Sequence, residues 1–168
     1  MKTLSIDIRR ADPQDAEAIA AVHDRSWRGA YAGIIPHRAL NAMINRRGPR
    51  WWANAIRRSA TVLVLEIGGE IAGYATLGRN RARELKQAGE IYELYLSPEY
   101  QGIGLGRRLF QTAREMLSAH GMKGMVVWAL EENLGAINFY RGAGGRDMAE
   151  GVEVFDSKAL RKIAFVWD

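Results

Sequence analysis

A glycine-rich segment near the middle of the chain has the residue types that hold a phosphate. It lies between a strand-like and a helix-like stretch and reads Gln101-Gly102-Ile103-Gly104-Leu105-Gly106-Arg107-Arg108. Glycines there let the backbone approach a ligand closely, and the free N–H groups and dipole of a helix N-terminus favour an anion. The P-loop and G-x-G-x-x-G patterns both fail, since arginine or leucine stands where they need lysine or a third glycine. The segment predicts a phosphate-binding turn of another class, with a plain turn as the alternative.

The composition restricts the chemistry available elsewhere. The chain has 168 residues, no cysteine and three histidines, which lie far apart at His23, His37 and His120. Disulfides, a thiol nucleophile and cysteine-based zinc sites are excluded, and we expect no metal site. The longest apolar run, near residues 125–130, is far shorter than a membrane span. Because residues 1–10 alternate and carry charges, we expect no signal peptide, no membrane association and a cytoplasmic protein.

The positive charge of the chain is concentrated in two basic segments. The net charge is +5, while residues 46–58 hold five arginines and no acid, and residues 79–86 hold four basic residues and one acid. Such segments either meet an anionic ligand or form solvated faces, and the sequence assigns them no role. No RNP, KH or helix-turn-helix signature accompanies them, so nucleic-acid binding is not expected.

The apolar periodicity predicts which elements surround the glycine-rich turn. Strands are expected near residues 4–8, 61–67, 70–77, 90–96, 125–130, 146–154 and 160–167, and helices over 13–29, 36–44, 50–60, 104–120 and 133–141. Gly68-Gly69 predicts a hairpin. This order indicates one domain, residues 1–168, of the α/β (α+β) class with helices on a mixed sheet. The strand–helix–strand unit over 90–130 should be a right-handed parallel crossover.

Two segments, together with this order, resemble the GCN5-related N-acetyltransferases (GNAT). Residues 101–106 are similar to the family's Q/R-x-x-G-x-G/A motif, and residues 133–140 to its N-x-x-A-x-x-F/L-Y segment. The resemblance covers nearly the whole chain. It implies a mostly antiparallel twisted sheet of about six or seven strands, splayed between the fourth and fifth. It also implies an enzyme that moves the acetyl group of acetyl-CoA to a primary amine of a small molecule, peptide or protein. A non-catalytic acyl-CoA sensor is the alternative, and homodimerisation is implied by the resemblance alone.

The resemblance also assigns residues to acetyl-CoA, which would lie between the fourth and fifth strands. The backbone of Leu94, Tyr95 and Leu96 would pair with the pantetheine arm. The pyrophosphate would bind the turn formed by Gln101, Gly102, Ile103, Gly104, Leu105, Gly106 and Arg107. Asn133 would contact the cofactor arm, cap a helix, or do both. Tyr140 would contact the cofactor near its sulfur and act as general acid, with a packed helix tyrosine as the alternative.

Two glutamates are candidates for the base that accepts the proton of the acceptor amine. Glu93 interrupts an apolar strand, and burial would raise the pKa of its carboxyl toward neutrality, which suits a general base. Glu90, at the start of the strand, is the rival. Alternation along a strand places the two on opposite faces unless the strand bulges. We expect Glu93 to be the base, with Glu90 or a water-mediated route as the alternatives.

The acceptor site is the least specified part of the sequence. Trp27 and Tyr31 are four residues apart and could share a helix face, either lining an amine site or packing in the core. The basic segments argue against a polycationic acceptor such as a polyamine. They would suit the 3′-phosphate of CoA or an acceptor with a carboxylate.

Overall fold

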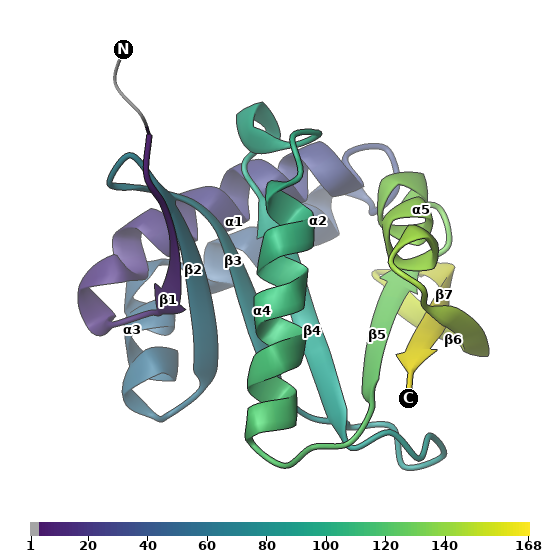
Figure 1. Cartoon of the computed structure of the whole chain (residues 1–168). Helices are drawn as coiled ribbons and strands as arrows, with labels where there is room; N and C mark the ends of the chain where they lie inside the picture. Colours follow the sequence, from purple (N-terminus) through teal and green to yellow (C-terminus); the bar gives the residue numbers. More distant parts are fainter. Residues whose placement is uncertain (1–3) are drawn as a thin grey trace.

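The computed structural model describes residues 4–168, which form one seven-stranded sheet with helices on both faces (Figure 1). Part of the segment from which we expect no signal peptide, residues 1–3, lies outside the described residues. The strands are β1 (Ile6–Arg10), β2 (Thr61–Ile67), β3 (Glu70–Arg79), β4 (Gly89–Leu96), β5 (Met125–Leu130), β6 (Arg146–Phe155) and β7 (Lys158–Trp167). The helices are α1 (Ala16–Tyr31), α2 (His37–Arg46), α3 (Pro49–Arg57), α4 (Leu105–Ala119) and α5 (Leu134–Gly142), with 3-10 turns at Pro13–Asp15 and Pro98–Tyr100.

The sheet has the order β1-β2-β3-β4-β5-β7-β6 and is antiparallel except between β4 and β5. The β4–β5 pairing covers only Gly89 with Met125 and Glu90 with Val126. Beyond these residues the two strands diverge, as Figure 1 shows. The predicted mixed, mostly antiparallel sheet that splays between its fourth and fifth strands is therefore confirmed.

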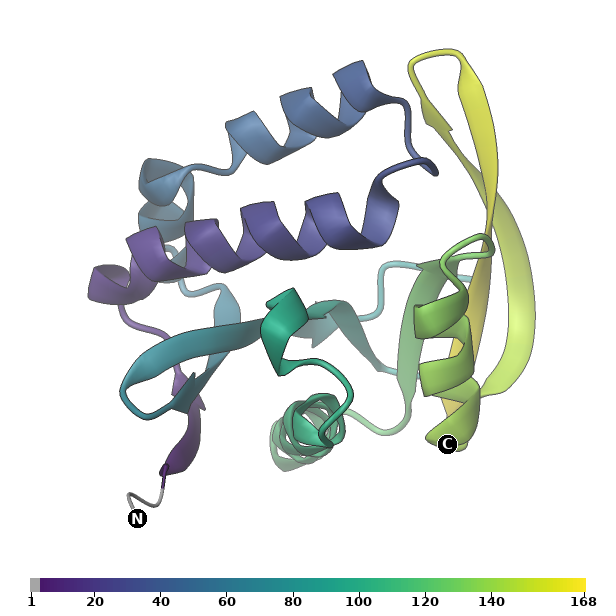
Figure 2. The same cartoon turned by 90° about the horizontal axis from the view of Figure 1, so that it is seen from above.

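The two faces of the sheet are covered by different helices. Helices α1, α2 and α3 lie on one face and α4 and α5 on the other (Figure 2). On the first face Ile19, Trp52 and Tyr74 are fully buried together. On the second, α4 packs Leu109 against a core that includes Phe165 of β7. These two cores fix β4 from both sides and leave its open edge toward β5 as the place for a site.

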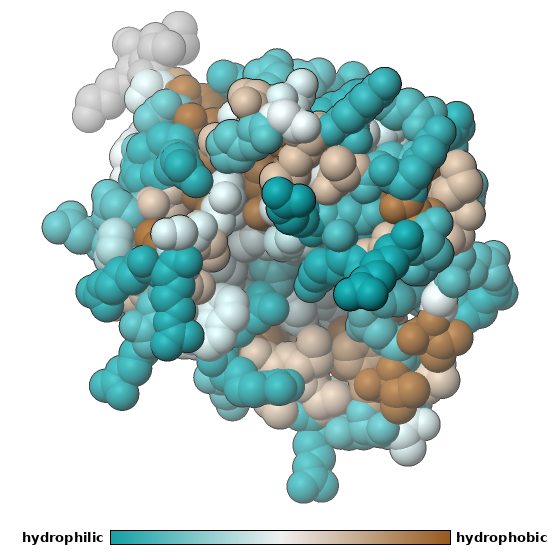
Figure 3. All heavy atoms as spheres, turned by 90° about the horizontal axis from the view of Figure 1, so that it is seen from below, coloured by the Kyte–Doolittle hydropathy of each residue, from teal (hydrophilic) through white to brown (hydrophobic). Residues whose placement is uncertain are grey.

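Polar residues dominate the outside. Hydrophilic side chains cover most of the face shown in Figure 3, and apolar ones show in patches between them, the largest toward the lower edge. None of the helices within residues 4–168 has the length and apolarity that crossing a bilayer requires.

Candidate active site

A groove of about 670 Å³ opens where β4 and β5 diverge. Its walls are the end of β4, the turn before α4, the segment 133–140 with α5, and the C-terminal part of α1. This volume lies within the roughly 300–1,000 Å³ range typical of ligand sites. Most residues that the family resemblance assigns to a cofactor line it: Leu94, Tyr95, Leu96, Gln101, Gly102, Gly104, Gly106, Arg107, Asn133 and Tyr140. We call it the β4–β5 groove.

The glycine-rich turn forms an open cradle of backbone groups at one end of this groove. Gly102 and Gly104 have φ values of +81° and +86°, and a Cβ on either would meet no atom within 4 Å. Backbone conformation therefore requires these glycines, and the space beside them is free for a ligand. The first hydrogen bond back to this turn runs from the Arg108 N–H to the Gly104 carbonyl at 3.3 Å. The N–H groups of the preceding first turn of α4 have no intrahelical partner, so the cradle fits a pyrophosphate.

Three members of the turn do not place their side chains as ligand contacts. Ile103 is exposed and Leu105 is buried in the core, and neither side chain lines the groove. Gln101 lines it, but its Nε2 donates to the Leu96 carbonyl at 3.0 Å, which ties the turn to the end of β4. What the cradle offers to a ligand is therefore mainly its backbone N–H groups.

Helix α5 and its N-cap contribute two polar side chains to the groove. Asn133 caps the helix by accepting a hydrogen bond from the Ala136 N–H at 3.3 Å, while it also lines the groove. Tyr140 is 6% exposed, and burial raises the pKa of its phenol well above the ordinary value. At neutral pH Tyr140 is therefore protonated and can donate a hydrogen bond into the groove.

A second, smaller cavity of about 170 Å³ lies on the other side of Tyr95, which lines both spaces. We call it the acidic cavity, because Glu90, Glu93 and Glu153 line it. It thus brings together the two rival base candidates. The alternation that placed Glu90 and Glu93 on opposite faces does not hold, because β4 bulges. Thr76 pairs with Glu93 and Leu77 with Ile91, which leaves Tyr92 as an extra residue between them.

Glu93 is a buried carboxylate with one charged partner. Its side chain is 9% exposed, it forms an ion pair with Arg47, and Thr76 Oγ1 donates to it at 3.4 Å. Burial raises the pKa of the Glu93 carboxyl, and the guanidinium of Arg47 opposes that rise. The direction agrees with the predicted environment of a general base.

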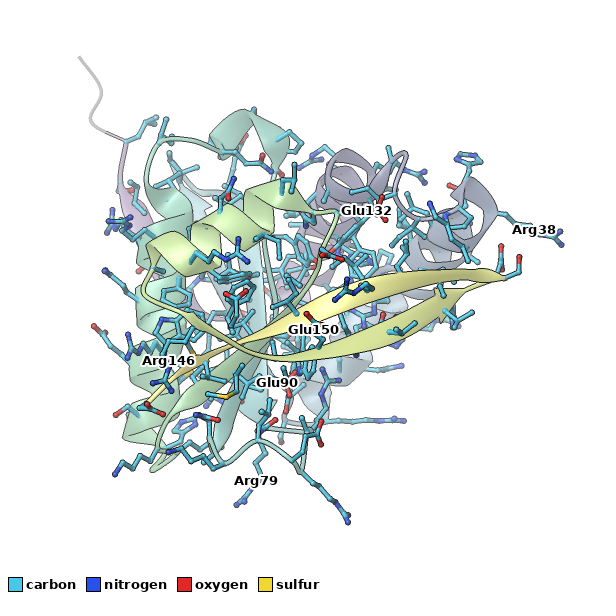
Figure 4. The ribbon with its side chains drawn as sticks, turned by 90° about the vertical axis from the view of Figure 1, so that its right-hand side faces the viewer. Arg38, Arg79, Glu90, Glu132, Arg146 and Glu150 are labelled. Carbon is cyan, nitrogen blue, oxygen red and sulfur yellow. The ribbon has the colours of Figure 1, made fainter. Side chains whose placement is uncertain are left out.

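The Glu90 carboxylate is more buried than that of Glu93 and accepts shorter hydrogen bonds from its neighbour Arg81 than Glu93 accepts from Thr76. Its side chain is 2% exposed and accepts from the backbone N–H of Arg81 at 3.0 Å and from Arg81 Nη2 at 2.9 Å. In the view of Figure 4, Glu90 lies just below the β6–β7 hairpin, whereas Arg79 points away from the molecule. Glu90 accepts from Arg81 on both oxygens, whereas the second oxygen of Glu93 has only the 3.4 Å contact with Thr76, so Glu90 is the less available of the two carboxylates.

Trp27 and Tyr31 pack in the core and also line the acidic cavity, and their contact with an amine stays a prediction. Each is 8% exposed and belongs to the core cluster between α1, α2 and the β6–β7 hairpin, and each lines the acidic cavity. Their rings meet edge to face at 5.3 Å between centroids, and the Tyr31 hydroxyl hydrogen-bonds that of Tyr95. They form a rigid aromatic wall beside the carboxylates.

Arg47 and Arg81, which come from the two basic segments, were not among the site residues predicted from the sequence. Arg47, between α2 and α3, lies 4.6 Å from the ring centroid of Trp51, and Arg81 lies 4.2 Å from that of Tyr92. Each segment thus supplies one guanidinium to one buried glutamate. An ion-pair partner for each glutamate could have been predicted from the two carboxylates in an apolar strand, because buried charges need partners.

This arrangement is that of a known class of acyl-transferring domains. The pattern of the Acetyltransferase (GNAT) family matches residues 20–144, and the chain belongs to this family. It is 32% identical over 162 residues to the uncharacterized N-acetyltransferase YuaI of Bacillus subtilis, covering 96% of this chain and 92% of that one. It is 26% identical to a spermidine N(1)-acetyltransferase of Thermoplasma acidophilum, covering 82% and 86%.

Solved structures share the fold. The PaiA N-acetyltransferase of Thermoplasma acidophilum in complex with coenzyme A aligns with a TM-score of 0.76 at 22% identity, covering 94% of this chain and 98% of that one. The acetyltransferase yncA of Salmonella typhimurium with acetyl-CoA aligns with a TM-score of 0.71 at 24% identity, covering 96% and 92%.

Proposed function

We propose that this protein transfers the acetyl group of acetyl-CoA directly to a primary amine. The observation that carries the proposal is the junction of two cavities at Tyr95. One contains a backbone cradle suited to a pyrophosphate, and the other contains a buried carboxylate of raised pKa. Membership of the GNAT family and the neighbours solved with coenzyme A and acetyl-CoA support the same cofactor for this chain.

The residues of the β4–β5 groove fit acetyl-CoA. The turn at 102–107 would bind its phosphates, and the free edge of β4 at residues 94–96 would pair with the amides of its arm. When bound, the cofactor supplies an acetyl group already activated as a thioester. The chain therefore needs no nucleophile of its own, in keeping with its lack of cysteine.

Glu93 would accept the proton that the amine must lose before it attacks. The guanidinium of Arg47 favours the ionised form of the Glu93 carboxyl, and burial raises its pKa, which makes it a better proton acceptor than an exposed glutamate. Glu90 would hold Arg81 and shape the cavity.

Tyr140 would donate a hydrogen bond toward the sulfur of the departing thiol. The raised pKa of its phenol lies above that of a free thiol, about 8.5. This favours hydrogen-bond donation over complete proton transfer, which refines the predicted role of a general acid.

Thiol release on mixing the protein, acetyl-CoA and a panel of primary amines tests the proposal, and mass spectrometry of the acetylated amine identifies the product. Amine-dependent release is expected, and Glu93→Gln should reduce it. Tight acetyl-CoA binding without release from any amine would contradict transfer and favour the sensor alternative.

A further inference from the structure

The charges around the acidic cavity are matched one to one. Each of its three carboxylates pairs with its own cation, and each of these cations also lies over an aromatic ring. The three sets are Glu93 with Arg47 and Trp51, Glu90 with Arg81 and Tyr92, and Glu153 with Lys162 and Trp128. In the third set Lys162 Nζ lies 3.1 Å from the Glu153 carboxylate and 4.8 Å from the centroid of the Trp128 ring.

This matching leaves no charged lining residue, within the described chain, without an opposite partner. A second ammonium on an acceptor would find every carboxylate already neutralised. A carboxylate on an acceptor would find every lining cation already engaged. Either charge would lose part of its water shell without a free counter-charge in return, and the loss is greatest near the buried Glu90 and Glu93, since the side chain of Glu153 is 51% exposed.

The remaining walls of the cavity are apolar or aromatic. They include Trp27, Tyr31, Ile35, Met43, Leu130 and Phe155. The volume of about 170 Å³ lies below the roughly 300–1,000 Å³ of common ligand sites. The walls therefore suit a compact, uncharged body of hydrocarbon or aromatic character.

We propose that the acceptor is a compact monoamine whose body carries no second charge, and that polyamines and amino acids are poor acceptors. This inference rests on the proposed function, since it takes the acidic cavity to be the amine site. The reacting ammonium passes its proton to Glu93 beside the aromatic wall of Trp27 and Tyr31 and so does not stay charged in the cavity, whereas a second charge on the acceptor would stay there without a free partner.

Calorimetric titration of CoA-saturated protein with matched pairs of amines tests whether a second charge on the acceptor weakens binding. Pentylamine against 1,5-diaminopentane adds only a second ammonium. 2-Phenylethylamine against phenylalanine adds a carboxylate, and phenylalaninamide controls for the branched carbon. Each added charge should weaken binding about tenfold or more, and the amide should bind like 2-phenylethylamine within roughly threefold.

Two substitutions at the mouth of the cavity should shift the preference among amines in opposite directions. Glu153→Gln leaves Lys162 without its partner and should improve phenylalanine relative to 2-phenylethylamine. Lys162→Met leaves Glu153 free and should improve 1,5-diaminopentane relative to pentylamine. Because these are ratios measured on one protein, partial loss of stability does not change their sign.

The outcomes separate the inference from the proposed function. Equal or tighter binding of either charged member, or no binding by any uncharged-body amine, overturns the inference. The expected order of affinities without thiol release overturns the transfer activity alone. Thiol release with a preference for 1,5-diaminopentane or phenylalanine overturns the inference and retains the transfer activity.

Discussion

Replacing Arg47 with methionine should destabilise the protein in a pH-dependent way. Methionine keeps much of the side-chain length against Trp51 but removes the charge that balances Glu93. The Glu93 carboxyl, already raised in pKa by burial, then loses the partner that opposes the rise. Its pKa in the folded variant should therefore lie further above the unfolded value.

The size of the effect follows from burial. Removing one partner of a fully buried pair costs about 3–5 kcal/mol. The Arg47 side chain is 31% exposed and Glu93 keeps its contact with Thr76, so solvent and this hydroxyl recover part of the loss. We expect the free energy of unfolding to fall by about 2 kcal/mol at neutral pH, which lowers Tm by roughly 4–8 °C for a domain of this size.

The sign of the pH dependence follows from proton linkage. A raised carboxyl pKa means that the folded variant binds a proton where the unfolded chain does not, so stability falls as pH rises through that window. The difference from the wild type should thus be largest at neutral pH and shrink in mild acid, where Glu93 becomes neutral. Urea unfolding at several pH values measures it.

Two further variants give the control. Arg46→Met changes an exposed arginine of the same segment and should alter stability by less than about 0.5 kcal/mol. Arg47→Met combined with Glu93→Gln removes both charges and should recover most of the loss, because the unpaired buried charge is gone. A loss that is equal at all pH values, or a double variant no more stable than Arg47→Met, would refute the reasoning.

Three predictions concern the chemistry. Glu93→Gln should lower turnover by about 10²–10⁴-fold and abolish the acidic limb of the pH–rate profile. Glu90→Gln, as the control, should retain that limb. If the limb is unchanged in Glu93→Gln, Glu93 is not the general base. Tyr140→Phe should lower turnover with acetyl-CoA affinity nearly intact, and unchanged turnover would remove its role. Gly104→Ala should weaken acetyl-CoA binding about fivefold or more by straining the cradle, while Gly121→Ala, equally left-handed but outside the groove, should not.

The order of elements was predictable because the apolar periodicity of this chain is regular. Gly68 and Gly69, which predicted the hairpin, both adopt positive φ between β2 and β3. The first helix was expected to end near residue 29 but continues to Tyr31, whose ring packs against Trp27 and Tyr95. Packing of Tyr31 against other elements thus extends α1 beyond the residue at which its sequence pattern predicted it to end.

The face on which Glu90 lies was not predictable from alternation. A bulge inserts one residue without any obligatory residue type, and here Tyr92 fills it. A Cβ on Gly78 would lie 2.7 Å from the Tyr92 hydroxyl, so the glycine opposite the bulge makes room for the ring. The glycine is visible in the sequence, but its relation to Tyr92 depends on a strand pairing known only from the fold.

The net charge of +5 proves to be a poor guide to the acceptor. The two residues of the basic segments that reach the acidic cavity, Arg47 and Arg81, are neutralised there by Glu93 and Glu90. The positive charge that remains in these segments lies on the surface, as at the exposed Arg79. Long-range fields from such residues act on encounter rates and fall off within about 10 Å at moderate salt. Selection at the amine site depends on local pairing, so reversing exposed charges should change the salt dependence of binding and leave the order of acceptors unchanged.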